Sequence, residues 1–89
     1  MDEDEITKLL SKKSLRVIKY LYGGNYATLR KLEIELKMNG LTARRYVDLL
    51  RRYGIVNVSR VGRAYVITLN REGKITKAII EFLRQVGYL

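Results

Sequence analysis

The chain has 89 residues and a net charge of +9 at pH 7, with 18 lysines and arginines against nine acidic residues. A chain of this length has room for one domain with a small core, because it buries only about 60–65% of the surface that it exposes when unfolded. Apolar residues make up 47% of the composition, which argues against intrinsic disorder and favours a folded basic protein with a polyanionic partner.

The charges are unevenly distributed along the chain. Residues 2–5 are all acidic, so residues 6–89 carry 18 basic and five acidic side chains, a net charge of +13. Histidine and cysteine are both absent, which excludes the usual zinc ligands, histidine general bases, cysteine nucleophiles and disulfides. The longest apolar run is residues 64–67 and the N-terminus is acidic, so we expect no membrane span and no signal peptide. The sequence predicts a cytoplasmic protein without a metal or a cofactor.

The first helical segment is predicted between residues 6 and 22. Two apolar stripes that are rotated relative to each other are formed by Ile6, Leu9 and Leu10 and by Leu15, Ile18 and Tyr22. Two short helices that meet near residues 11–14, or one long helix buried on two sides, fit this pattern equally. The acidic residues 2–5 suit a helix N-terminus, where the helix dipole favours negative charge. The alternative is an interacting tail that tempers non-specific anion binding.

Two helices separated by a short turn are predicted next. The first runs from Thr28, its N-cap, to about Met38, and Asn39-Gly40 makes the turn. The second helix covers Leu41 to Tyr53. Its apolar side chains gather on one face and the residues Arg45, Asp48 and Arg52 lie on the opposite face.

A β-hairpin and a last helix complete the chain. The β-branched residues alternate in 55–60 and 64–69, and residues 61–63 supply the turn between these arms. The final helix is predicted over residues 74–87, with the strongest amphipathic pattern of the sequence. Ile80 lies outside its apolar stripe. The order of elements predicts a winged helix-turn-helix, an α+β fold that is mostly α and that occupies residues 1–89 as one DNA-binding domain.

The helix over residues 41–53 carries the candidate base-reading side chains. A helix fits the major groove and reads it from its first turns, where Thr42, Arg44 and Arg45 lie. Arginine can hold guanine O6 and N7 together. Asp48 lies on the same face as Arg52, where it can orient an arginine or accept a hydrogen bond from cytosine N4.

Other candidate DNA contacts come from the elements on either side of this helix. The arginines at the hairpin tip, within residues 60–64, can enter the minor groove, where negative potential is concentrated. The N-terminus of the preceding helix offers free amides near Thr28 and the side chains of Arg30 and Lys31 to phosphate groups.

Residues 41–56 resemble the recognition helix and following turn of winged helix-turn-helix transcriptional regulators. The MarR, ArsR and PadR-like groups, and small archaeal and archaeal-virus regulators, have a similar helix ending. The matching residues are Leu50, Gly54, Ile55 and Val56, and residues 65–68 with Gly73 resemble the second wing strand and the glycine after it. The resemblance spans roughly residues 14–73.

The resemblance implies roles for particular residues. It implies that Thr42, Arg44, Arg45 and Tyr46 face the major groove and that Arg60, Gly62 and Arg63 form the wing tip. It also implies that the end segments dimerise, as they do in many members. Metal-sensing ArsR-type relatives use ligands that this sequence lacks, so metal-triggered release is not expected.

A homodimer is predicted from the apolar surface of the two ends, residues 3–11 and 74–87. The predicted interface residues are Ile6, Leu9, Leu10, Ile75, Ala78, Ile79, Phe82, Leu83 and Val86. A symmetric pair places two recognition helices about 34–36 Å apart, one turn of DNA. The alternative is a last helix that packs only within its own protomer.

The sequence thus predicts a nucleoid-associated regulator of transcription that binds specific double-stranded DNA. A sequence-tolerant architectural DNA-binding protein and a winged-helix module for protein–protein contacts are the alternatives. No enzyme is expected, because residues 6–89 offer no paired carboxylates, phosphate-binding glycine loop or nucleophile–base set. The abundance of arginine, isoleucine, tyrosine and valine and the absence of cysteine and proline indicate a thermophilic archaeal or archaeal-virus source.

Overall fold

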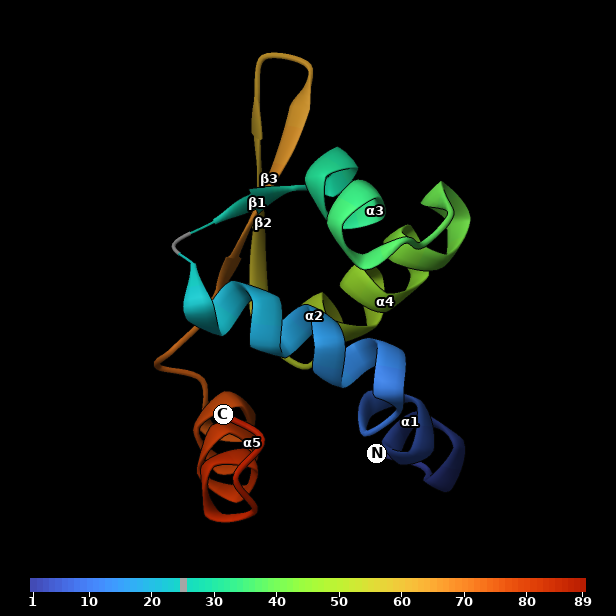
Figure 1. The fold of residues 1–89 in the computed structure, drawn as a ribbon. Helices are drawn as coiled ribbons and strands as arrows, with labels where there is room; N and C mark the ends of the chain where they lie inside the picture. Colours follow the sequence, from blue (N-terminus) through green and yellow to red (C-terminus); the bar gives the residue numbers. More distant parts are fainter. Residues whose placement is uncertain (25) are drawn as a thin grey trace.

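A computed structural model describes residues 1–24 and 26–89, and its elements follow the predicted order (Figure 1). The five helices are α1 (Glu3–Leu9), α2 (Lys12–Gly23), α3 (Leu29–Leu36), α4 (Gly40–Arg52) and α5 (Lys74–Gln85). The three strands are β1 (Ala27–Thr28), β2 (Val56–Val61) and β3 (Ala64–Leu69). The prediction of a mostly helical winged helix-turn-helix is therefore confirmed.

The N-terminal segment forms two short helices rather than one long helix. Asp2 caps α1 by accepting a hydrogen bond from the Glu5 amide at 2.8 Å, so the acidic run does serve a helix start. Ser11 caps α2 in the same way and accepts from the Ser14 amide at 3.4 Å. Because each helix has its own cap, the two apolar stripes of the sequence belong to separate helices.

The turn between α3 and α4 determines how the two helices meet. Lys37 adopts the left-handed conformation and ends α3, so the predicted end near Met38 was two residues too long. Asn39 caps α4 by accepting from the Thr42 amide at 2.8 Å. A Cβ atom on Gly40 would come within 2.9 Å of a Glu33 carboxylate oxygen. Gly40 is thus inside α4 at a close contact with α3, and the helix begins one residue before its predicted start at Leu41.

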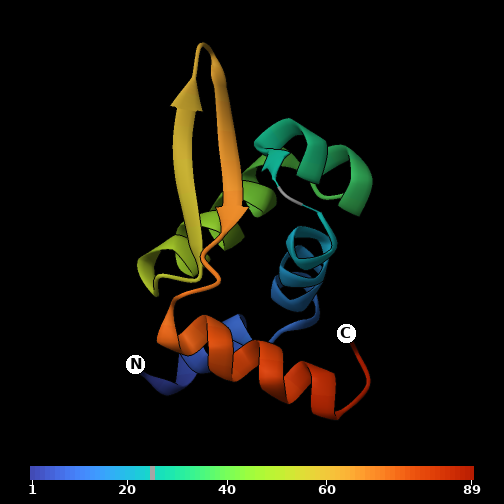
Figure 2. The same ribbon diagram turned by 90° about the vertical axis from the view of Figure 1, so that its left-hand side faces the viewer.

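The wing is an antiparallel hairpin that projects beyond the helices (Figure 2). Val61 pairs with Ala64, which leaves Gly62 and Arg63 as a two-residue turn. Gly54 ends α4 and fixes the base of the wing. Its φ of +71° allows the next backbone amide, that of Ile55, to donate to the Leu50 carbonyl at 2.9 Å. The first arm therefore begins at Val56 rather than at Ile55.

A third strand was not predicted from the sequence. β1 pairs with β3, Ala27 opposite Ile67 and Thr28 opposite Val66, so the sheet order is β1-β3-β2. Two residues are too few for an alternating pattern to be recognised. This short strand nevertheless connects α2 to α3 and brings the N-terminus of α3 to the side of the wing.

The core fills the space between the helix-turn-helix and the base of the sheet. Its fully buried side chains include Ile18 and Leu21 of α2, Leu32 of α3, Leu50 of α4 and Ile67 of β3. These five side chains come from four elements, so their packing fixes the position of α4 relative to the wing.

α5 lies with α1 at the end of the molecule opposite the wing tip (Figures 1 and 2). Thr76, Ile79 and Leu83 face the core and are buried. Ile80 also packs against the core, which contradicts its predicted place away from the packed face. The helix ends at Gln85, two residues before the predicted end, and the Tyr88 amide donates to the Leu83 carbonyl at 2.8 Å.

Candidate nucleic-acid interface

α4 presents a straight stripe of exposed side chains on the face opposite its buried one. The buried face contains Ala43, Val47 and Leu50. The exposed stripe, which we call the α4 ridge, consists of Leu41, Arg45, Asp48 and Arg52. Their spacing of four, three and four residues places them along one line of a helix. The structure thus brings three predicted DNA-contacting residues together, and it adds Leu41.

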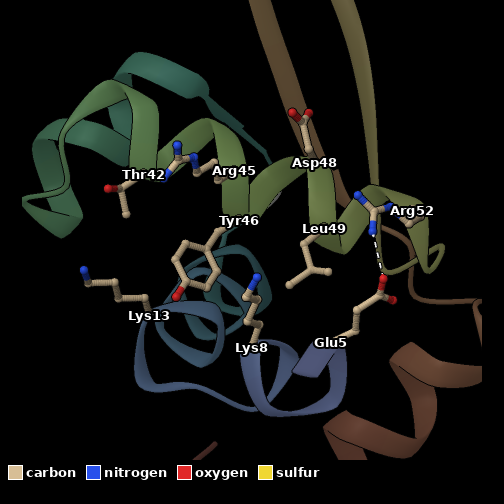
Figure 3. Close-up of a pocket in the computed structure, with 9 residues that line it drawn as sticks. All are labelled: Glu5, Lys8, Lys13, Thr42, Arg45, Tyr46, Asp48, Leu49 and Arg52. Atoms are coloured by element: carbon tan, nitrogen blue, oxygen red, sulfur yellow. Dashed lines mark hydrogen bonds and ion pairs between the residues drawn. The ribbon is translucent and has the colours of Figure 1, made fainter. Parts of the chain in front are cut away.

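One side of the α4 ridge borders a groove of about 540 Å³ against α1 and the start of α2 (Figure 3). Lys8 and Lys13 line the wall that faces α4, and Thr42 and Arg45 line the opposite wall. The phenol of Tyr46 lies 3.5 Å from the Ser11 hydroxyl, so this side chain is directed toward the start of α2 and not outward with the α4 ridge, contrary to its expected place at the major groove (Figure 3). Cationic side chains of three helices therefore surround one groove beside the α4 ridge.

Arg52 is held by a residue of α1. Its guanidinium lies 3.2 Å from the Glu5 carboxylate (Figure 3). Asp48 forms no ion pair among the described residues, and its side chain points away from α1. The carboxylate that orients Arg52 is thus Glu5 and not Asp48, which leaves Asp48 open on the α4 ridge.

The other side of the α4 ridge faces the wing through Tyr65. The Arg44 guanidinium lies 5.7 Å from the centre of the Tyr65 ring, and the Arg60 guanidinium lies 5.8 Å from it. Tyr65 is directly opposite Arg60 across the hairpin. Arg60 also donates to the Gly62 carbonyl at 3.2 Å. Stacking on one ring therefore links an arginine of α4 to an arginine of the wing.

The N-terminus of α3 and the wing tip border a second groove of about 520 Å³. Its lining includes Arg30 of α3, Thr28, which is the N-cap of α3, and Arg63 of the wing tip. Thr28 uses its hydroxyl to accept from the Lys31 amide at 3.1 Å. The structure thus places Arg30 and Arg63 at one groove, although 33 positions separate them in the sequence.

Lys31 differs from its predicted neighbours. Its ammonium lies 3.0 Å from the Glu35 carboxylate one helical turn away. The hydrogen bond to Glu35, and then the negative charge of Glu35, raise the pKa of Lys31 above its usual value of 10.5. Lys31 is charged at neutral pH with or without this shift, and the ion pair compensates part of its charge within α3.

Two cations of the interface were missed by sequence reasoning. Lys8 lies in α1 and Lys13 in α2, both far in sequence from α4. Only the packing of α1 and α2 beside α4 places them at the groove. Leu41 was missed because an apolar residue was not considered as a contact for a polyanion.

The predicted dimer residues divide into buried and exposed sets. Leu9, Ile79 and Leu83 are buried within the protomer, so the core already accounts for them. The exposed ones are Ile6, Leu10, Ala78, Phe82 and Val86, and Ile75 is half-buried. The exposed side chains belong to α1, its C-cap, α5 and the residue after it, at the end of the molecule opposite the wing tip.

No helix in the described part of the chain is long and apolar enough to cross a membrane. No group of three acidic side chains that could hold a metal ion is found among the residues whose positions are described.

Comparison with solved structures identifies the fold. No protein-family model matches the sequence, and no curated protein matches it. HlyU from Vibrio cholerae N16961 superposes with a TM-score of 0.77 at 20% identity, with 100% of each chain covered. An ArsR family transcriptional regulator, RHA00566, gives 0.68 at 17% identity, covering 92% of this chain and 84% of that one. A transcriptional regulator homologue from Pyrococcus horikoshii OT3 gives 0.69 at 16%, covering 93% of both. The expected resemblance to ArsR-type winged helices is thus confirmed for the fold.

Proposed function

We propose that residues 1–89 act as one winged-helix domain that binds specific double-stranded DNA and regulates transcription. The observation that carries this proposal is the α4 ridge, which has cations on both sides. Lys8 and Lys13 line the groove toward α1 and α2, and Arg44 and Arg60 stack on Tyr65 toward the wing. A helix inserted in the major groove has a phosphate backbone on each side. Lys8 and Lys13 on one side and Arg60 and Arg63 on the other suit those two backbones. Two of the structures with this fold are described as a transcriptional regulator and a regulator homologue.

The exposed side chains suggest how the domain reads DNA. Arg45 reaches guanine from the α4 ridge, and Asp48 accepts from a cytosine amino group. Thr42 and Arg44 contact the backbone or bases beside them. The wing tip, Arg60 to Arg63, lies along the minor groove. The phosphate contact at the N-terminus of α3 comes from Thr28 and Arg30, whereas Lys31 contributes less because it is paired with Glu35.

The protein acts as a homodimer in this proposal. Phe82 and Val86 are 58% and 59% exposed, and Ile6 and Leu10 are exposed on α1 and at its C-cap. An apolar surface of this kind suits an isologous interface, in which the same residues of both copies meet. The dimer would place two α4 ridges on the same face of the duplex. In a cell, the protein would then reside in the cytoplasm on nucleoid DNA. An archaeal source stays a prediction from composition.

A salt titration tests DNA binding. The logarithm of the association constant for a 30-base-pair duplex should fall with the logarithm of salt concentration, with a slope of roughly −0.9 for each phosphate neutralised. We expect at least four such contacts per protomer from the cations named above. A slope near zero, or no binding near 100 mM salt, would contradict the proposal.

Selection from a random duplex pool separates a regulator from an architectural protein. The proposed dimer predicts enrichment of an inverted repeat with half-sites one DNA turn apart. A pool that gains no consensus while binding remains tight would favour sequence-tolerant architectural binding instead.

Light scattering of the eluting protein tests the dimer. Wild-type protein at tens of micromolar should have twice the mass of the chain, and Phe82→Glu should have the monomer mass. Ile34→Glu is the matched control, because Ile34 on α3 is 61% exposed, close to the 58% of Phe82. A monomeric wild type, or a Phe82→Glu protein that remains dimeric, would contradict the interface.

A further inference from the structure

Leu41 is an apolar side chain in an otherwise charged stripe. It lies in the first turn of α4, directly after Gly40, and 61% of its surface is exposed. The other members of the α4 ridge are two arginines and an aspartate. An isolated exposed leucine is ordinary on a protein surface. What distinguishes Leu41 is its position at the end of the recognition helix that enters the groove first.

The capping of α4 fixes where Leu41 points. Asn39 holds the Thr42 amide at 2.8 Å, and Gly40 is pressed against Glu33 of α3. The first turn of α4 is therefore held on both sides of Leu41. Arg45 follows four residues later on the same line, and its side chain runs along α4 toward Thr42 (Figure 3). The four-residue spacing and the exposure of Leu41 place it on the same exposed line of α4 as Arg45.

The major groove contains one apolar group, the 5-methyl group of thymine. We infer that Leu41 contacts a thymine methyl group and is a specificity-determining residue of the site. The inference rests on the DNA-binding function proposed above. Arg45 and Asp48 account for guanine and cytosine, and no polar residue of the α4 ridge has the amide that pairs with adenine. Leu41 therefore supplies the reading of A·T pairs, from the thymine side.

The spacing of the two residues predicts where the thymine lies. Side chains four residues apart on a helix have Cβ atoms about 5–6 Å apart. Successive bases of one strand are about 3.4 Å apart along the helix axis. The thymine should therefore lie within about two base pairs of the guanine that Arg45 contacts, in each half-site.

Leu41 is separate from the apolar surface assigned to the dimer. Phe82 and Val86 belong to α5 and the residue after it, and Ile6 to α1, at the far end of the molecule from the wing tip (Figure 1). Leu41 is next to the turn that joins α3 to α4. A second copy bound through α1 and α5 leaves it open to DNA.

Replacement of thymine by uracil tests the contact, since uracil differs only by the missing methyl group. The duplex is the sequence selected from the random pool, and each thymine of one half-site is replaced in turn. Wild-type protein should lose about fourfold in affinity at one thymine, the loss expected for one methyl group removed from an apolar contact. Leu41→Ala should bind the thymine and uracil duplexes equally.

Ile34→Ala is the matched control, because Ile34 has the same 61% exposure on α3 and does not belong to the α4 ridge. It should keep the full fourfold effect. A wild-type protein insensitive to every thymine methyl group would overturn the inference, as would an effect that survives in Leu41→Ala. Either result leaves DNA binding itself intact. A protein that binds no duplex at all would instead refute the proposed function.

Discussion

Glu5→Gln should increase the affinity of the protein for duplex DNA. Glu5 holds the Arg52 guanidinium at 3.2 Å, and Arg52 is the last residue of the α4 ridge. The carboxylate competes with phosphate for the same cation. Glutamine is similar in size to glutamate, and the substitution leaves the backbone N–H of residue 5 that donates to Asp2, so α1 should remain folded. The change therefore tests whether the contact between α1 and Arg52 restrains binding.

The expected size follows from the exposure of the pair. The Arg52 side chain is 61% exposed, and exposed ion pairs are worth about 0.2–1 kcal/mol. Releasing Arg52 should therefore raise affinity by about 1.4-fold to fivefold for each protomer. If Arg52 then contacts a phosphate, the slope of the salt titration should become steeper by about 0.9. Fluorescence anisotropy with a labelled duplex between 50 and about 200 mM salt measures both quantities.

Glu3→Gln is the control for this experiment. Glu3 lies in the same short helix, is exposed, and forms no ion pair among the described residues. The Glu3→Gln substitution removes the same charge from the vicinity of the DNA without releasing Arg52. Equal effects of the two substitutions would mean that only long-range charge matters. Weaker binding by Glu5→Gln would mean that Glu5 positions Arg52 for DNA rather than restraining it.

Substitutions at three further positions test other features of the structure. Tyr65→Ala should weaken duplex binding, by at most about 1 kcal/mol for each of the two stacked arginines, whereas Tyr65→Phe should bind as wild type does in the same assay. Ser14→Ala should raise the free energy of unfolding by about 1 kcal/mol in urea denaturation. The reason is that the Ser14 hydroxyl is buried without a hydrogen-bond partner among the described residues. A loss of stability would reveal a partner. Gly54→Ala should lower the free energy of unfolding by about 1–2 kcal/mol, since Gly54 has a φ of +71°; an unchanged midpoint would contradict its role at the end of α4.

Sequence reasoning predicted those elements of the fold that have a period. The stripe of Ala43, Val47 and Leu50 identified α4, and the alternating valines identified the hairpin, because burial on one face imposes these patterns. Boundaries differed where a single residue decided them. The left-handed Lys37 and the Asn39 cap are local conformations that a hydrophobic pattern does not encode.

The candidate site was predicted in part for a similar reason. Arg44, Arg45, Arg60 and Arg63 could be identified from one helix and one turn. The pairing of Arg52 with Glu5, across 47 positions, depends on how α1 packs beside α4, and no local pattern contains that information. Tyr65 joins Arg44 to Arg60 only because the wing folds next to the recognition helix. Tertiary contacts thus decide which cations are free to bind DNA.

The most direct test of DNA reading by α4 compares wild type and Arg45→Ala on two duplexes at one salt concentration. One duplex contains the selected site and the other the same bases in scrambled order. A specific contact to guanine predicts that Arg45→Ala loses about 1–3 kcal/mol on the selected site. The loss on the scrambled duplex should be much smaller, so the ratio of the two affinities should approach one. An equal loss on both duplexes would contradict reading by α4 and would reduce Arg45 to a phosphate contact.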